Sequence, residues 1–124
     1  MNPDISNAVQ ALLEARRSGR QVAPPFALAD RAAVYAIQDG VARATGPVAG
    51  WKVGARTPTA EPNPAPLLAG ALVPSPATFD GREMHMIGVE VEISFHVVKD
   101  IAACREPVGR DEALAAVGDA CVGM

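Results

Sequence analysis

Apolar residues near the start of the chain recur every three or four positions, which places them on one face of an α-helix. Asp4 and Ser6 are suitable helix caps, and Gly19 is expected to stop the helix. The inner face would carry Ile5, Val9, Leu12 and Leu13.

A second helix is predicted from residue 31 to about residue 45, after Pro24-Pro25, which favour extended chain. Asp30 is its expected N-cap, and Gly46-Pro47 ends it. The apolar stripe consists of several alanines with Val34, Ile37 and Val41.

The second part of the chain favours short strands. Residues 48–54 and 89–98 have strand character, the second more clearly than any other segment. Residues 70–73 and 77–79 are predicted to be two shorter strands. The segment 58–66 is predicted to be a loop that does not join a sheet, because it holds Pro58, Pro62, Pro64 and Pro66.

The chain is predicted to finish with a helix from residue 111 to about 121, with Ala113, Leu114, Val117 and Cys121 on one side. No strand is expected after it, so the chain is expected to stop within its fold. Helices followed by strands, without βαβ alternation, indicate an α+β class. A hydrophobic content of 49% suffices for a core, and an aromatic content of 4% makes that core aliphatic.

Charge and motifs exclude several classes of function. The net charge of -3 disfavours a nucleic-acid surface, and no apolar run is long enough to span a bilayer. Three arginines near the end of the first helix complement its dipole without a ligand: Arg16, Arg17 and Arg20. No glycine-rich phosphate loop occurs. Cys104 and Cys121 lack a CxxC spacing and are expected to be free thiols of a cytoplasmic protein.

Two carboxylates interrupt the strand predicted for residues 89–98. Alternation along a strand puts Glu90 and Glu92 on one face together with Ser94 and His96. The two glutamates would lie roughly 7 Å apart at the backbone. Oxygen ligands of this kind suit Mg²⁺ or Mn²⁺ better than Zn²⁺. From spacing alone, a solvated strand face is the commoner explanation.

Lys52 lies in the middle of the strand predicted for residues 48–54. It either protects a sheet edge from aggregation or is a lysine with a lowered pKa that moves protons or holds an anionic oxygen. His85 and His96 are more often surface or structural residues than ligands. Neither cysteine has a base at a recognisable spacing, which argues against a thiol nucleophile.

Three motifs in this order carry a resemblance to a known family. They are YAIQ at 35–38, GWKVG at 50–54, and GVEVEISF at 88–95 followed by Lys99-Asp100. The chain resembles the N-terminal half of the 2-keto-4-pentenoate hydratase branch of the fumarylacetoacetate hydrolase superfamily. That branch also includes 4-oxalocrotonate decarboxylases.

The resemblance implies helices in residues 1–46 and, in residues 47–124, the first part of a mixed β-roll. It implies that Glu90 and Glu92 bind Mg²⁺ or Mn²⁺ and that Lys52 is the active-site lysine. The substrate would be a small 2-oxo or 2-hydroxydienoic acid from aromatic catabolism, and the activity that of a lyase. A full-length protein would be a homo-oligomer.

Two departures from the family pattern keep alternatives open. The third metal-binding Glu of the family is expected after the last helix, beyond Met124. The Asp that hydratases carry shortly before the glycine of the next strand is replaced by Leu67-Leu68-Ala69 before Gly70. A decarboxylase of the 4-oxalocrotonate type and a catalytically inert fragment therefore remain alternatives. A non-enzymatic module that binds small acids has only Lys52 in its favour.

Overall fold

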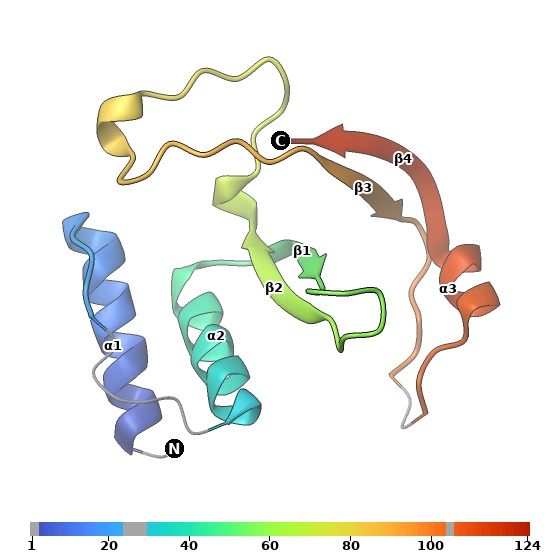
Figure 1. The fold of residues 1–124 in the computed structure, drawn as a ribbon, viewed down its shortest axis with the longest axis horizontal. Coiled ribbons are helices and arrows are strands. Elements are labelled where there is room, and N and C mark those ends of the chain that lie inside the picture. Colours follow the sequence, from blue (N-terminus) through green and yellow to red (C-terminus); the bar gives the residue numbers. More distant parts are fainter. Residues whose placement is uncertain (1–2, 24–29, 104–105) are drawn as a thin grey trace. The chain divides into compact units, whose positions relative to one another are not determined.

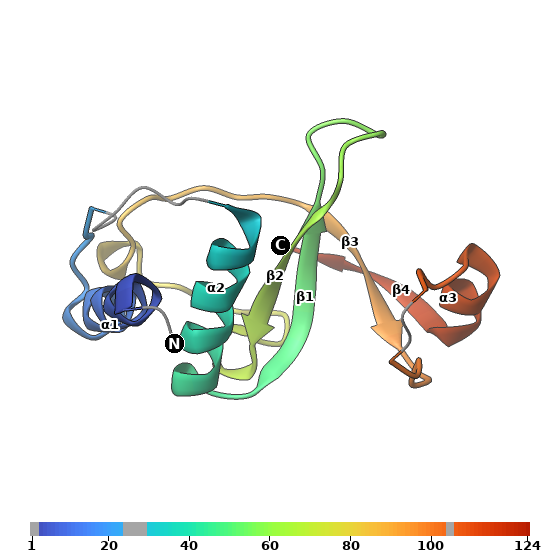
Figure 2. The same ribbon diagram turned by 90° about the horizontal axis from the view of Figure 1, so that it is seen from below.

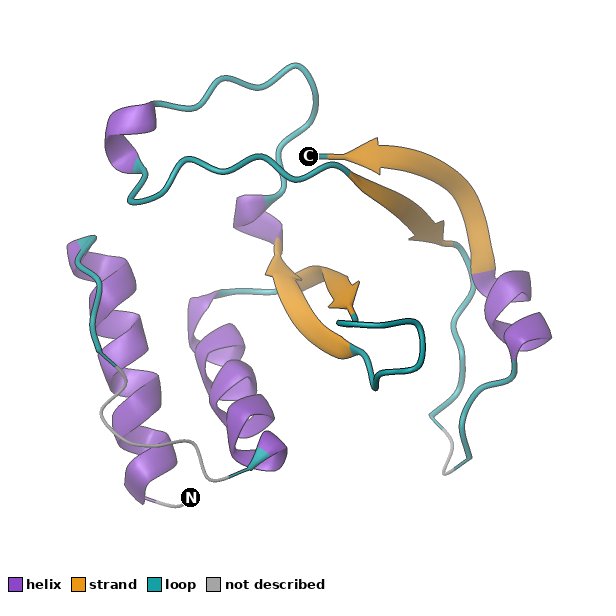
Figure 3. Cartoon of the chain, in the orientation of Figure 1, coloured by secondary structure: helices purple, strands orange, loops and turns teal. Residues whose placement is uncertain are grey.

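The computed structural model describes residues 3–23, 30–103 and 106–124, which contain three α-helices and two small antiparallel sheets (Figures 1 and 3). The predicted α+β class is confirmed. Pro24-Pro25 and Cys104 lie outside the described residues. The chain divides into two compact units, Met1–Glu83 and Met84–Met124. None of the helices in the described ranges has the length and apolar character that a membrane span requires.

The first unit begins with the two helices that the periodicity predicts. Helix α1 spans Pro3–Ser18 and is followed by Gly19, whose φ of 65° suits a residue without a Cβ. Helix α2 spans Arg31–Thr45, and its N-cap Asp30 accepts a hydrogen bond from the backbone N–H of Ala33 at 2.7 Å. Both helices are confirmed, but the predicted caps Asp4 and Ser6 lie within the first turns of α1.

A small aliphatic core joins these two helices. Ala8 and Val9 of α1 pack against Ile37 and Val41 of α2. The helices approach closely at Gly40, where an added Cβ would lie 2.6 Å from Cγ2 of Val9. A larger residue at this crossing would force Val9 or the helices to shift, which favours glycine although it is a poor helix former.

Strands β1 (Val48–Gly54) and β2 (Asn63–Leu68) form an antiparallel hairpin. Helix α2 lies beside β2, as Figure 2 shows. The prediction that residues 58–66 stay out of a sheet is wrong for their last part, because Pro64 and Pro66 belong to β2. These two prolines are two residues apart and face the same way, so neither needs to donate to β1. Among the described residues β2 pairs only with β1, so its other edge tolerates the missing proline N–H groups.

The strands predicted at 70–73 and 77–79 are absent from this described part of the chain. A short 3₁₀ helix, η1, spans Ala69–Ala71, and a second, η2, spans Gly81–Glu83. Pro74 and Pro76 interrupt the segment between them and remove two backbone donors, which leaves too few consecutive residues for a ladder.

The second unit holds β3 (Glu92–Val97), α3 (Arg110–Ala116) and β4 (Val117–Gly123). The predicted helix over 111–121 is wrong in its second half, because the chain turns into β4 at Val117 and pairs with β3. Gly118 and Gly123 disfavour a helix there. The side chain of Val98 lies close to the backbone of β4, since a Cβ on Gly118 would lie 2.6 Å from Cγ1 of Val98.

Candidate functional site

The two candidate metal-binding glutamates lie at the start of the second hairpin. Glu92 is the first residue of β3 and pairs with Gly123 of β4. Glu90 precedes the strand by two residues, and both glutamates are exposed. The strand predicted over 89–98 thus begins later, because residues 89–91 have no partner strand in the described part of the chain. The geometry of β3 therefore fixes the sheet face to which the Glu92 side chain points, but it does not fix the direction of the Glu90 side chain.

Polar and small residues share the sheet face of Glu92. Residues directly opposite one another in an antiparallel sheet point to the same side, so Ser94 and its partner Cys121 lie on this face with Glu92. Gly123, opposite Glu92, contributes no side chain, and a Cβ there would lie 2.8 Å from the Ser94 hydroxyl oxygen. The Ser94 side chain therefore occupies the space that a side chain at residue 123 would fill.

Lys52 belongs to the first unit, in the middle of β1 and opposite Ala65 of β2. Its neighbours on the same side of the strand are Gly50 and Gly54, which have no side chains. Trp51, on the other side, lines a hollow with Ala42 and Arg43 of α2. Lys52 accordingly lies on the open side of the hairpin and is exposed. Glu90 and Glu92 lie in the other unit.

The donor types of Glu90 and Glu92 fit a hard divalent cation. Mg²⁺ is commonly bound by one or two carboxylates, with water and substrate oxygens completing its shell. Within residues 3–23, 30–103 and 106–124, no group of three or more histidine, cysteine, aspartate or glutamate side chains is arranged to hold a metal ion.

Three further candidate residues lie in the second unit with the two glutamates. His96 is near the end of β3, and His85 is exposed in the segment before that strand. Cys121 is a free, exposed thiol on β4.

Sequence reasoning missed a cluster around Arg31. The Arg31 side chain donates a 2.9 Å hydrogen bond to the Tyr35 hydroxyl and a second hydrogen bond to the carbonyl oxygen of Pro62. It also pairs with Glu61, for which the sequence indicated no role. The four-residue spacing of Arg31 and Tyr35 could have predicted their contact, because it places both side chains on one face of the helix. The cluster holds the loop before β2 to the start of α2.

The chain matches no family model, no curated protein and no solved structure in three comparisons with known proteins.

Proposed function

We propose that this chain carries part of the site of a divalent-metal-dependent hydratase acting on 2-hydroxy-2,4-dienoates. The observation that carries the proposal is the placement of Glu92 at the start of β3 opposite Gly123, with Glu90 two residues earlier. Both carboxylates are exposed. The proposal includes a mixed β-roll of the fumarylacetoacetate hydrolase type, of which each hairpin is a part.

Glu90 and Glu92 would bind Mg²⁺ or Mn²⁺ in this proposal. The chemistry that such an ion supplies is Lewis-acid polarisation of an oxygen of the substrate. Lys52 supplies a positive charge or a proton to the substrate as its dienol becomes a ketone. Addition of one water at C4 then gives a 4-hydroxy-2-oxo acid. Gly50 and Gly54, the neighbours of Lys52 on the same side of β1, carry no side chains.

Metal binding and turnover test the proposal separately. The 124-residue chain is titrated with Mn²⁺, and free Mn²⁺ is followed by electron paramagnetic resonance. Turnover of 2-hydroxypenta-2,4-dienoate is followed by the loss of dienol absorbance. Glu90→Gln and Glu92→Gln are expected to weaken Mn²⁺ binding and abolish metal-dependent turnover. Glu83→Gln, which removes an exposed carboxylate of η2, is the matched control and should change neither.

The assignment fails if Glu90→Gln leaves metal-dependent turnover undiminished, or if the wild-type chain does not bind Mn²⁺. A decarboxylase of the 4-oxalocrotonate type would use the same two carboxylates, with loss of CO₂ forming the enolate. Product analysis separates the two reactions, because the hydratase forms a hydroxylated acid and the decarboxylase releases CO₂.

A second candidate is a chain that is inert alone and requires additional strands from a partner. The favouring observation is the exposure of the apolar side of the second hairpin, where Ile93 and its cross-strand partner Val122 are each 74% exposed. Such a surface with free strand edges favours association. Light scattering is expected to show oligomers or aggregates. A monodisperse monomer with a cooperative thermal transition would contradict this candidate.

A further inference from the structure

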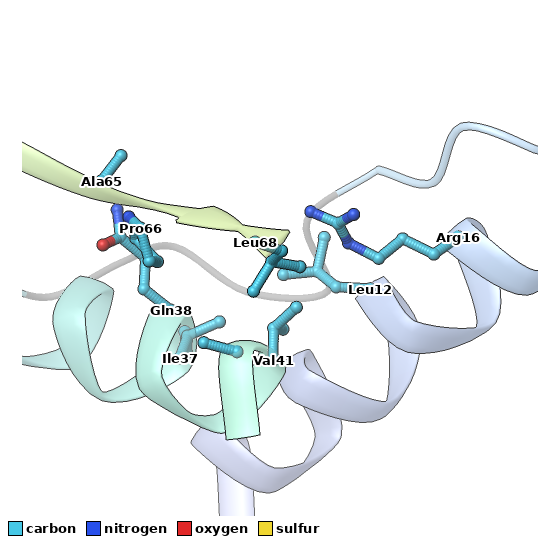
Figure 4. Close-up of a pocket in the computed structure, with 9 residues that line it drawn as sticks. Leu12, Arg16, Ile37, Gln38, Val41, Ala65, Pro66 and Leu68 are labelled. Carbon is cyan, nitrogen blue, oxygen red and sulfur yellow. The ribbon is translucent and has the colours of Figure 1, made fainter. Parts of the chain in front are cut away.

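A cavity in the first unit lies between α1, α2 and β2, and the proposed reaction does not use it. Its volume is about 270 Å³. Figure 4 shows its walls, which are mainly aliphatic: Leu12, Ile37, Val41 and Leu68. Ile37 and Val41 are buried members of the helix core, so the apolar surface of the cavity continues the core. The volume is slightly below the range of about 300–1,000 Å³ that is usual for drug-sized ligands.

Two polar side chains reach this apolar surface, one from each helix. Arg16 extends from α1 towards Leu68, and Gln38 projects from α2 beside Pro66 (Figure 4). Arg17, the residue after Arg16, forms an ion pair with Glu14, with 2.7 Å between Nη2 of Arg17 and Oε1 of Glu14. Within the described ranges, no side chain forms an ion pair with Arg16. The cavity therefore combines an apolar wall, an unpaired cation and an amide.

We propose that this cavity binds a small amphipathic monocarboxylate. Its carboxylate would accept hydrogen bonds from the Arg16 guanidinium, whose planar arrangement of donors suits a carboxylate. Its apolar body would cover Ile37, Val41 and Leu68. At about 30 Å³ for each water-sized group, the cavity holds about nine non-hydrogen atoms. A short-chain aliphatic acid meets this size and this charge.

The alternative role of Arg16 is a surface cation that only complements the dipole of α1. The two roles differ in their consequences. A dipole-complementing arginine affects helix stability and makes no distinction between charged and neutral ligands. An arginine that receives a carboxylate makes the cavity prefer an acid over an alcohol of the same length.

The test uses hexanoate and hexan-1-ol as probes of the 124-residue chain. Binding is followed by chemical-shift changes in ¹H–¹⁵N spectra. Hexanoate is expected to bind saturably, with shifts at Ile37, Val41 and Leu68, and more tightly than hexan-1-ol. Arg16→Gln should weaken hexanoate binding about tenfold, the effect of losing a charge-assisted contact, and leave hexan-1-ol binding unchanged.

Arg20→Gln is the matched control, because Arg20 follows α1 and does not line the cavity. It should leave the binding of both probes unchanged. Ala42→Leu adds volume at the cavity wall and should weaken the binding of both hexanoate and hexan-1-ol. Absence of saturable hexanoate binding, shifts that map elsewhere, or equal weakening by Arg16→Gln and Arg20→Gln would each overturn the proposal. None of these results depends on Glu90, Glu92 or Lys52.

Discussion

Arg31 of α2 and Glu61 of the loop before β2 form an ion pair, with Nη1 of Arg31 3.1 Å from Oε2 of Glu61. The guanidinium also lies over the Tyr35 ring, 5.3 Å from its centre. One side chain therefore connects two segments that are about thirty residues apart, since Arg31 also donates a hydrogen bond to the carbonyl oxygen of Pro62. The loop that enters β2 is held at the N-terminal end of α2.

Removing the two members of this pair is expected to have unequal effects. Glu61→Gln should lower the free energy of unfolding by less than about 1 kcal/mol, because the Glu61 side chain is 76% exposed and such pairs contribute little. Arg31→Ala should lower it by about 1–2 kcal/mol, because the hydrogen bonds to Tyr35 and Pro62 are lost as well. Urea denaturation measures both values. Equal effects would show that the ion pair alone connects the segments.

Gly40→Ala is expected to destabilise the first unit. The new methyl group would lie 2.6 Å from Cγ2 of Val9, so the helices must separate. Overpacking costs about 1–3 kcal/mol, and the better helix propensity of alanine offsets about 1 kcal/mol of that cost. Thermal unfolding followed by circular dichroism should show a lower midpoint. Gly70→Ala is the control, because a Cβ at Gly70 has no neighbour within 4 Å. A midpoint raised by Gly40→Ala would contradict the close crossing.

Asp30→Ala removes the side chain that caps α2. Its carboxylate accepts a hydrogen bond from the Ala33 N–H at 2.7 Å, and loss of such a cap costs about 1 kcal/mol. Asp30→Ser should retain most of this stability, because serine is also a good N-cap residue. Chemical denaturation distinguishes the two variants. If they unfold alike, the cap does not contribute.

The Asp80 carboxylate is expected to titrate at a lower pH than an ordinary aspartate. The Arg82 side chain and backbone N–H both donate hydrogen bonds to it, which lowers the pKa of Asp80 from its usual 3.8. A lowered pKa in the folded state means that the interaction stabilises the fold above pH 3.8 and is lost as the pH falls through the folded value. Carboxyl titration by NMR measures this shift. Arg82→Gln should return the pKa towards 3.8, and an unchanged value would contradict the proposed cause.

The candidate site was predictable from the sequence only in part. The spacing of Glu90 and Glu92 and the strand character around them are local features, and they indicate a pair of carboxylates near a strand. The pairing of Gly123 with Glu92 and of Cys121 with Ser94 was not predictable, because the sequence predicts a helix from residue 111 to about 121 and no strand after it. The signal that was available is the pair of glycines at 118 and 123, which disfavour a helix.

The sequence by itself determined α1 and α2, because their apolar spacing and the cap at Asp30 act over a few neighbouring residues. The sequence also predicted β1 over residues 48–54, whereas tertiary structure decided β2 and β4. Pro64 and Pro66 can belong to β2 because their backbone nitrogens point away from β1. The hydrogen bonds between the two strands therefore need no N–H group from either proline. Residues 117–123 become β4 because β3, about twenty-five residues away, supplies their hydrogen-bond partners. A strand depends on a partner from elsewhere in the chain, whereas a helix satisfies its backbone within itself.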